Sequence, residues 1–253
     1  MDNKSILDRF ELLFSSDTRF RDLRRFALDN DVNSLFRLLE TFSDSQLIIA
    51  TKKLLHDPMF AQDCMSRGQI RSKLWLIEEL KKKELDLGTV FLCGGWYATL
   101  ATMIFENDMN VKKIRSFDLD ASCWKIAETF NKPWVMKNWQ FKSCTQDIHD
   151  INYETHVYNV NRSDGSVCEL TDSPDTVINT SCEHINNFKE WYDKIPAGKI
   201  VILQTNNYFD LPEHVNCSKS LDDFAEQTPM TEVLYAGELS LEKYSRFMRI
   251  GIK

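Results

Sequence analysis

The sequence contains no apolar run long enough to cross a membrane, and it has little glycine and proline. Among its 253 residues, 8 are glycine and 6 are proline, which excludes collagen-like chains and disfavours long disordered segments. A membrane-spanning helix needs about 20 consecutive apolar residues, and no segment approaches that length. Residues 1–5 lead into an amphipathic segment instead of a signal-peptide core. These absences predict a globular, cytoplasmic protein without a membrane partner.

The sequence also has no excess of positive charge and no cluster of cysteines. The chain has 31 lysine and arginine residues against 38 aspartate and glutamate residues, a net charge of −7 at pH 7. This balance disfavours broad capture of a nucleic-acid backbone, so we expect a small-molecule partner. The 7 cysteines are scattered, with no Cys-x-x-Cys motif and no cysteine–histidine cluster. We therefore expect no metal site, and we expect several reduced cysteines in the core.

Residues 5–87 have the apolar spacing of helices throughout. Apolar side chains recur at three- and four-residue intervals, with a break at Pro58. The stripes are Ile6, Phe10, Leu13 and Phe14; Phe20, Leu23, Phe26 and Ala27; and Leu35, Leu38, Leu39 and Phe42. The expected N-caps are Ser16 or Asp17, and Ser43 or Asp44. A further helix follows Gly68 and ends in three lysines, 81–83, which suit the negative end of a helix dipole.

After residue 87, strand and helix patterns alternate. We expect strands at 88–93, 112–118, 139–146, 175–181, 198–205, 231–238 and 245–252, and helices at 97–107, 121–130, 184–194 and 218–226. This alternation predicts a parallel sheet with helices on both faces, closed by an antiparallel pair of strands. A separate hairpin is expected over 156–170, because an Asp-Gly turn separates two alternating segments. The predicted fold class is α/β, a Rossmann-like seven-stranded sheet.

Two successive predicted strand ends carry residues that suggest a nucleoside-containing cofactor. The first strand passes from Cys93 into Gly94, Gly95, Trp96 and Tyr97, and the second ends in Phe117, Asp118, Leu119 and Asp120. Glycine lets the backbone approach a ligand closely, and an acid at the next strand end can hold ribose hydroxyls. We assign ribose binding to Asp118. Asp120 is the second candidate, and its structural alternative is to cap the helix that starts near Ala121.

From Gly88 to Lys253 the order of elements resembles a class I S-adenosylmethionine (SAM)-dependent methyltransferase. Residues 90–98 are similar to that family's first motif, with Gly94, Trp96 and Ala98 at its three glycine positions. The resemblance implies SAM as cofactor, with Asp147 at the adenine amine and Ile148 packed on the ring. It also implies cofactor contacts from residues beside or at the strand ends: Cys93, Gly95, Tyr97, Leu119, Asn179 and Thr180. A nicotinamide dinucleotide is the weaker alternative, because Ala98 stands where a close-packing glycine is usual.

Polar residues gather at the next strand ends, where the resemblance places groups that face the methyl acceptor. The candidate catalytic residues are Glu183, His184, Asn206, Tyr208 and His214. A methyl acceptor must lose a proton, so Glu183, His184 or His214 is a candidate general base. The structural alternative is that Glu183 and His184 cap the following helix and that His214 is a surface loop residue.

The expected organisation is a helical region over residues 1–86, serving as a lid or in oligomerisation, and a SAM-binding domain over 87–253. We expect the N-terminal helices and the hairpin at 154–170 to shape the acceptor pocket, with Arg71, Ser72 and Lys73 closing the site. The predicted function is a SAM-dependent methyltransferase that acts on a small molecule. Two alternatives stay open: an enzyme that cleaves or cyclises SAM or transfers its aminocarboxypropyl arm, and a non-catalytic SAM-binding module.

Overall fold

The computed structural model describes residues 22, 25, 29, 31–40 and 43–253, and the chain divides into two compact units, 1–60 and 61–253. In the smaller unit, α3 (Val32–Glu40) and α4 (Gln46–Leu54) are helices. An ion pair of 2.7 Å links Lys52 of α4 to Glu40 at the end of α3. The residue before α4 is Ser45, so this helix begins slightly later than the predicted caps at Ser43 or Asp44 imply.

Several predicted features of the first 42 residues lie outside the described residues. They are the stripes Ile6, Phe10, Leu13 and Phe14 and Phe20, Leu23, Phe26 and Ala27, the caps Ser16 and Asp17, and Phe42. Within the part of the chain that is described, no helix is both long and apolar enough to cross a bilayer.

The larger unit is built on a seven-stranded sheet with the order β3-β2-β1-β6-β7-β9-β8. The strands are β1 (Gly88–Cys93), β2 (Val111–Asp118), β3 (Phe141–Thr145), β6 (Thr176–Asn179), β7 (Ile200–Asn206), β8 (Glu232–Ser240) and β9 (Ser245–Ile252). The first five strands in this order run parallel, and β9 is antiparallel to β7 and to β8. This arrangement confirms the predicted fold class and its antiparallel finish.

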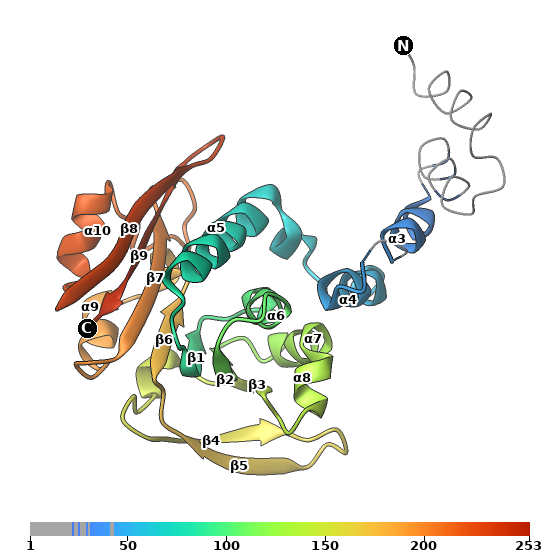
Figure 1. Cartoon of the computed structure of the whole chain (residues 1–253), viewed down its shortest axis with the longest axis horizontal. Coiled ribbons are helices and arrows are strands. Elements are labelled where there is room, and N and C mark those ends of the chain that lie inside the picture. The colour runs from blue at the N-terminus through green and yellow to red at the C-terminus, as the bar shows by residue number, and fades with distance from the viewer. Residues whose placement is uncertain (1–21, 23–24, 26–28, 30, 41–42) are drawn as a thin grey trace. The chain divides into compact units, whose positions relative to one another are not determined.

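Helices cover both faces of this sheet (Figure 1). On one side lie α5 (Arg67–Lys83), α6 (Thr99–Glu106) and α7 (Cys123–Phe130), with the short α8 (Lys132–Met136) after α7; on the other lie α9 (Phe188–Asp193) and α10 (Leu221–Gln227). Three 3₁₀ turns complete the unit: η1 (Gln62–Met65), η2 (Ile148–Asp150) and η3 (Cys182–His184). The three lysines do close α5, and Ser220 caps α10 by accepting a hydrogen bond from the Asp223 N–H at 3.1 Å.

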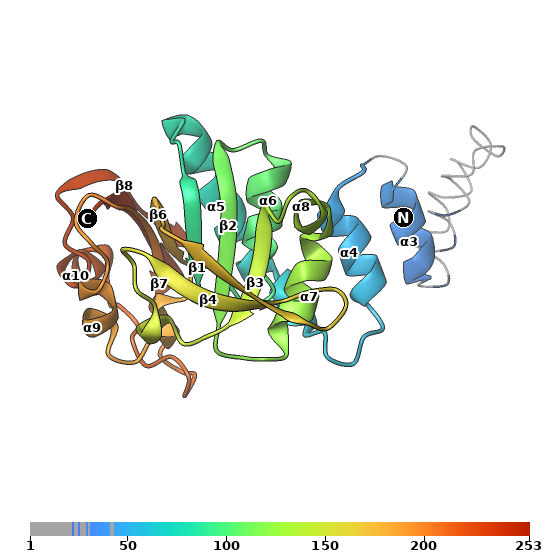
Figure 2. The same cartoon turned by 90° about the horizontal axis from the view of Figure 1, so that it is seen from below.

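The predicted hairpin is confirmed as a separate two-stranded sheet, β4 (His156–Asn161) paired with β5 (Val167–Asp172). It lies across β2 and β3 (Figure 2), where the Tyr158 ring packs edge-on against Phe117 with centroids 5.3 Å apart. The Asp172 carboxylate at the end of β5 accepts a hydrogen bond of 2.7 Å from Arg115 of β2, and others from Lys113 and Tyr158. Buried charges thus fix the hairpin to the sheet.

The main buried core joins the sheet to the hairpin, α9 and α10. Large rings fill it, and Trp191 of α9 donates a hydrogen bond of 2.6 Å to the hydroxyl of Tyr153, which in turn packs near Phe91 of β1. Five of the cysteines are buried, as expected: Cys64, Cys93, Cys123, Cys144 and Cys182. This core holds the sheet rigidly beneath the ends of its parallel strands, which is where a ligand is bound in open α/β sheets.

The first prediction concerns Asp172, which is almost fully buried with Arg115. Burial raises the pKa of Asp172, but the hydrogen bonds and charges of Lys113, Tyr158 and Arg115 outweigh it, so the pKa lies below its usual value. Asp172→Asn leaves the Arg115 charge without its partner. We expect the free energy of unfolding at pH 7 to fall by about 3 kcal/mol in urea denaturation.

The loss of stability in Asp172→Asn should become smaller as the pH falls. Because folding lowers this pKa, the stabilisation is complete above the unfolded value, near pH 4, and disappears as the pH falls through the folded value. The difference between parent and variant should therefore shrink between pH 5 and pH 3. Glu169→Gln, at an exposed position on the same strand, removes the same charge and should change stability by less than about 0.5 kcal/mol. An equal loss at every pH would contradict the role of the ionised carboxylate.

Candidate active site

A cleft of about 1230 Å³ opens along the edge of the sheet where the parallel strands end. Each of these strands contributes a residue at or just after its last position: Gly94 after β1, Asp118 of β2, Asp147 after β3, Ser181 after β6 and Asn206 of β7. Further wall comes from the segments after β6 and β7, from η1 and the start of α5, and from the β8–β9 connection with the first residues of β9. Its residues include Asp63, Arg67, Gln69, Arg71, Leu241, Lys243, Tyr244 and Arg246.

The loop after β1 keeps the backbone shape of a glycine-rich loop although it contains few glycines. Gly94, Trp96 and Ala98 have φ angles of +63°, +48° and +49°, all in the left-handed region that favours glycine. A Cβ on Gly94 would meet no atom within 4 Å, so this residue borders open space in the cleft. A Cβ on Gly95 would lie 2.1 Å from the Ser116 hydroxyl, so this second glycine serves close packing on β2.

Asp118 connects this loop to the end of β2. Its carboxylate accepts hydrogen bonds from the Trp96 N–H at 2.7 Å and the Asp120 N–H at 3.0 Å. Burial raises the pKa of Asp118 against the effect of these hydrogen bonds. Asp120 instead accepts the Ser122 N–H at 2.8 Å, in the turn before α7, and does not line the cleft. The structure brings Asp118 to the cleft, whereas Asp120 shapes the turn before α7 and does not cap that helix, which begins at Cys123 with Ser122 as its N-cap residue.

The other predicted cofactor residues fall into two groups. The cleft is lined by Gly94, Trp96, Leu119, Asp147 and Ile148, and the Leu119 side chain is 71% exposed there. Its lining does not include Cys93, Gly95, Tyr97, Asp120, Asn179 and Thr180. Members of this second group make contacts behind the surface of the cleft: the Tyr97 hydroxyl accepts the Ala61 N–H at 3.1 Å, and the Asn179 side chain accepts the Ser181 N–H at 2.8 Å.

The polar half of the cleft is organised around Glu183, which is 1% exposed. One oxygen of its carboxylate, Oε1, accepts hydrogen bonds of 2.7 Å from Asn206 and 2.7 Å from Arg246 of β9. Arg246 also donates to the Thr180 carbonyl at 2.8 Å. The loop after β7 is tied to the same point, because the Asn216 N–H donates to the Glu183 carbonyl at 2.9 Å. These contacts bring segments from β6, β7 and β9 together.

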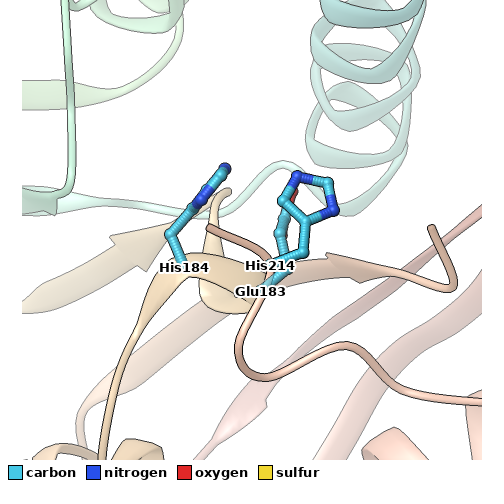
Figure 3. A group of neighbouring side chains, drawn as sticks. All are labelled: Glu183, His184 and His214. Atoms are coloured by element: carbon cyan, nitrogen blue, oxygen red, sulfur yellow. The ribbon is translucent and has the colours of Figure 1, made fainter. Parts of the chain in front are cut away.

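Two histidines face each other beside Glu183 (Figure 3). The His184 and His214 rings meet edge to face with centroids 4.7 Å apart. His184 Nδ1 lies 3.1 Å from the Glu213 carbonyl, and His214 Nδ1 lies 2.6 Å from the Tyr208 carbonyl. A carbonyl only accepts, so each Nδ1 carries the proton and each Nε2 keeps its lone pair when the ring is neutral.

The structure corrects the capping alternative for Glu183 and His184. The predicted helix at 184–194 begins only at Phe188, because the backbone at Ile185 is extended, and Asn187 with φ +50° precedes the helix. Glu183 and His184 lie in η3 and cap nothing in α9. His214 is half-buried and lines the cleft, so it is not a plain surface loop residue.

Two expectations about the walls of the cleft also need correction. No residue of the hairpin at 156–172 lines it, because the hairpin is held on the face of β2 and β3. Of the three residues expected to close the site, Arg71 lines the cleft, whereas Ser72 and Lys73 are buried. Arg246, Arg67, Asp63 and Tyr244 also line the cleft, although no sequence motif predicted them. One of them, Arg246, could have been suspected from Glu183. A carboxylate that is buried just after a strand requires a positively charged partner.

Cys182 and Cys217 are not candidates for nucleophiles. Burial raises the pKa of the Cys182 thiol well above its usual value and that of Cys217 to about 11. Both are therefore neutral thiols near pH 7.

The second prediction concerns Lys73 of α5, which is buried near Glu183 and Arg246 of the cleft. It is 7% exposed and donates to the Gln69 side chain at 2.5 Å. Burial, with repulsion from Arg246, lowers the pKa of Lys73 to about 7. Between pH 7 and about pH 10 the folded chain therefore binds fewer protons than the unfolded chain, and the parent gains stability as the pH rises.

Lys73→Met removes this dependence. The stability of Lys73→Met relative to the parent should be highest at pH 7 and should decline by roughly 3 kcal/mol towards pH 10, as measured by urea unfolding. Lys82→Met, on the exposed end of the same helix, should show the same pH profile as the parent. Parallel curves for Lys73→Met and the parent would show that Lys73 titrates normally.

No protein-family model matches the sequence, and no curated protein matches it. Solved structures share its fold. The N-methyltransferase NodS from Bradyrhizobium japonicum WM9 aligns with a TM-score of 0.51 and 10% identity over 74% of this chain and 98% of its own. Magnesium protoporphyrin IX methyltransferase (ChlM) from Synechocystis PCC 6803, solved with bound SAM, aligns with a TM-score of 0.50 and 14% identity over 94% of this chain and 97% of its own.

A third structure is phosphoethanolamine N-methyltransferase 2 from Haemonchus contortus in complex with SAM. It aligns with a TM-score of 0.51 and 10% identity over 84% of this chain and 60% of its own. At such low identities the likeness concerns the fold. The chain therefore has the fold of class I SAM-dependent methyltransferases, as the order of its elements suggested.

Proposed function

We propose that this protein is a SAM-dependent methyltransferase that acts on a small-molecule acceptor. One observation carries the proposal: a single cleft is lined at one end by Gly94, Asp118 and Asp147, and at the other by Glu183 and two histidines. The first group suits an adenosyl compound, and the second suits an acceptor that loses a proton. The shared fold with enzymes solved with SAM supports the same cofactor.

In the proposed complex, Asp118 holds the ribose hydroxyls. Its carboxylate is fixed by backbone N–H groups and faces the cleft, whereas Asp120 does not. Asp147 accepts from the adenine amine, and Ile148 packs on the ring. Gly94 borders the methionine portion, where the absence of a side chain leaves room. Trp96 and Leu119 offer apolar surface beside these polar contacts.

SAM supplies a methyl group activated by its positive sulfur. The chain's own contribution is to hold the acceptor in line with that methyl and to provide for the proton that it loses. His184 and His214 each have an Nε2 with a lone pair directed away from the carbonyl that fixes the ring. Asn206 and Tyr208 are suited to orient polar groups of the acceptor, because both line the cleft next to these histidines.

The walls of the cleft favour a small molecule over nucleic acid. Its volume of about 1230 Å³ is slightly above the range of common ligand pockets, which suits a cofactor plus a small acceptor. Cations such as Arg67, Arg71 and Lys243 are interspersed with the carboxylates Asp63 and Glu213. Such mixed charge does not make the continuous positive surface that a phosphate backbone needs.

We also propose that residues 61–86 cover the cofactor. They contribute Asp63, Arg67 and Arg71 to the cleft. A Cβ on Gly68 would lie 2.8 Å from the Tyr244 hydroxyl, so the start of α5 packs closely against the β8–β9 connection. A helix placed in this way can exclude water from the reacting groups.

The third prediction tests the cofactor site. Asp118→Ala removes the proposed ribose contacts, so the dissociation constant for SAM should rise by about 10- to 100-fold in calorimetry. Asp120→Ala, two residues away and outside the cleft, should bind SAM like the parent. Circular dichroism of both variants checks that they are folded. Unchanged SAM affinity in Asp118→Ala would overturn the ribose assignment, and preferential binding of NAD by the parent would overturn SAM as cofactor.

The fourth prediction concerns the reaction. With SAM alone we expect no turnover, and with a pool of small-molecule acceptors we expect S-adenosylhomocysteine, identified by mass spectrometry. Release of methylthioadenosine without an acceptor would instead support cleavage or aminocarboxypropyl transfer. Tight SAM binding without product from any acceptor would support a binding module.

A further inference from the structure

We propose that Glu183, His184 and His214 form a binding site for a divalent transition-metal cation of the Zn²⁺ type. Each residue offers one ligand atom, and the three atoms lie within 4.8 Å of one another. The side chains come from two segments, η3 and the loop after β7, and lie beside one another (Figure 3); all three line the cleft. A general base requires one such group, whereas three convergent donors are what a metal ion requires.

The histidines are held as metal-binding histidines usually are. Metal-ligating imidazoles generally donate their second ring N–H to a carbonyl or carboxylate, which fixes the tautomer and the ring orientation. Here His184 Nδ1 donates to the Glu213 carbonyl at 3.1 Å, and His214 Nδ1 donates to the Tyr208 carbonyl at 2.6 Å. Both Nε2 atoms are therefore left as donors of a lone pair.

The carboxylate of Glu183 supplies the independent observation. Its Oε1 accepts from Asn206 and Arg246, but its Oε2 is buried and has no hydrogen-bond partner among the described residues. A buried carboxylate oxygen without a partner is costly and calls for an explanation, such as an ion. Coordination of a cation by Oε2 would satisfy it, while Asn206 and Arg246 hold the carboxylate in place through Oε1.

The surrounding charges allow a cation here. The Arg246 charge is balanced by Glu183 itself, to which it is paired at 2.7 Å. The cleft lining also contains the carboxylates of Asp63, Asp147 and Glu213, which offset the charges of Arg67, Arg71 and Lys243.

The chemical type of the three ligand atoms indicates which class of metal would bind. Two imidazoles and one carboxylate suit Zn²⁺ and similar transition metals, whereas Mg²⁺ and Ca²⁺ prefer oxygen donors only. Zn–N bonds of about 2.1 Å imply ligand atoms roughly 3.4 Å apart in a tetrahedral site, so ligand atoms that now lie up to 4.8 Å apart must approach one another by up to about 1.4 Å. His184 is exposed and His214 half-buried, so neither ring is enclosed by packed core side chains on all sides.

Three protein ligands leave at least one coordination position for another molecule. Here that position would face the cleft, where an oxygen or nitrogen of the methyl acceptor could occupy it. This last step rests on the proposed function, whereas binding of the metal itself does not.

The test uses the full chain, stripped of metal with a chelator and titrated with Zn²⁺ by calorimetry and with Co²⁺ by visible absorption. We expect one equivalent of each to bind, with the Co²⁺ bands of a four- or five-coordinate site, and no comparable binding of Mg²⁺. His184→Ala and His214→Ala should each weaken Zn²⁺ binding by at least about tenfold. Both replace side chains that are not fully buried, so the fold should persist.

His149→Ala is the matched control, because His149 lines the same cleft but is not one of the three ligands; its Nε2 lies 3.0 Å from the Asn186 carbonyl. It should bind Zn²⁺ like the parent. No stoichiometric binding, or binding that survives both ligand variants, would overturn the metal site. Calorimetry with SAM on the same samples separates the two proposals: a parent that binds SAM without Zn²⁺ refutes only the metal, and one that binds Zn²⁺ without SAM refutes only the cofactor.

Discussion

The polar half of the cleft depends on a buried ion pair between the Glu183 carboxylate, just after β6, and the Arg246 guanidinium of β9. The two groups are 2.7 Å apart and nearly inaccessible to water. Breaking such a pair by removing one partner leaves an uncompensated buried charge, which is strongly destabilising. Asn206 joins the pair from β7, so three strand ends are fixed at one point. The positions of His184 and His214 follow from this arrangement, since their loops are hydrogen-bonded to the same segment.

The loop after β1 adopts the backbone shape of a glycine-rich loop with Trp96 and Ala98 at two of its left-handed positions. Trp96 and Ala98 occupy left-handed backbone that costs a residue with a side chain roughly 1–2 kcal/mol. The loop is held in that shape from outside, because the Asp118 carboxylate accepts the Trp96 N–H. In our proposal the same carboxylate binds ribose, so loop geometry and cofactor binding would depend on one side chain.

The hairpin at 156–172 could be predicted from local sequence patterns, but its position in the fold could not. Its Asp-Gly turn and alternating strands were predicted correctly, but its place in the molecule was not. The buried charges of Asp172 and Arg115, 57 positions apart in the chain, decide that it lies on β2 and β3, away from the cleft. The residues next to Asp172 in the sequence do not predict Arg115 as its partner, and those next to Arg115 do not predict Asp172. The wall expected from the hairpin is supplied instead by the start of α5 and the β8–β9 connection.

Sequence patterns alone were enough to predict the order of strands and helices, the fold class, and the residues at the strand ends, including Gly94, Asp118 and Asp147. These features are local, because apolar periodicity, turn residues and strand-end acids act over a few neighbouring positions. Three features became visible only in the folded chain: Arg246 pairs with Glu183, Lys73 is buried, and the rings of His184 and His214, 30 positions apart, are in contact. Such contacts depend on how the whole sheet is assembled and on the free-energy cost of burying a charge without a partner. A short segment of sequence predicts neither the assembly nor the partner.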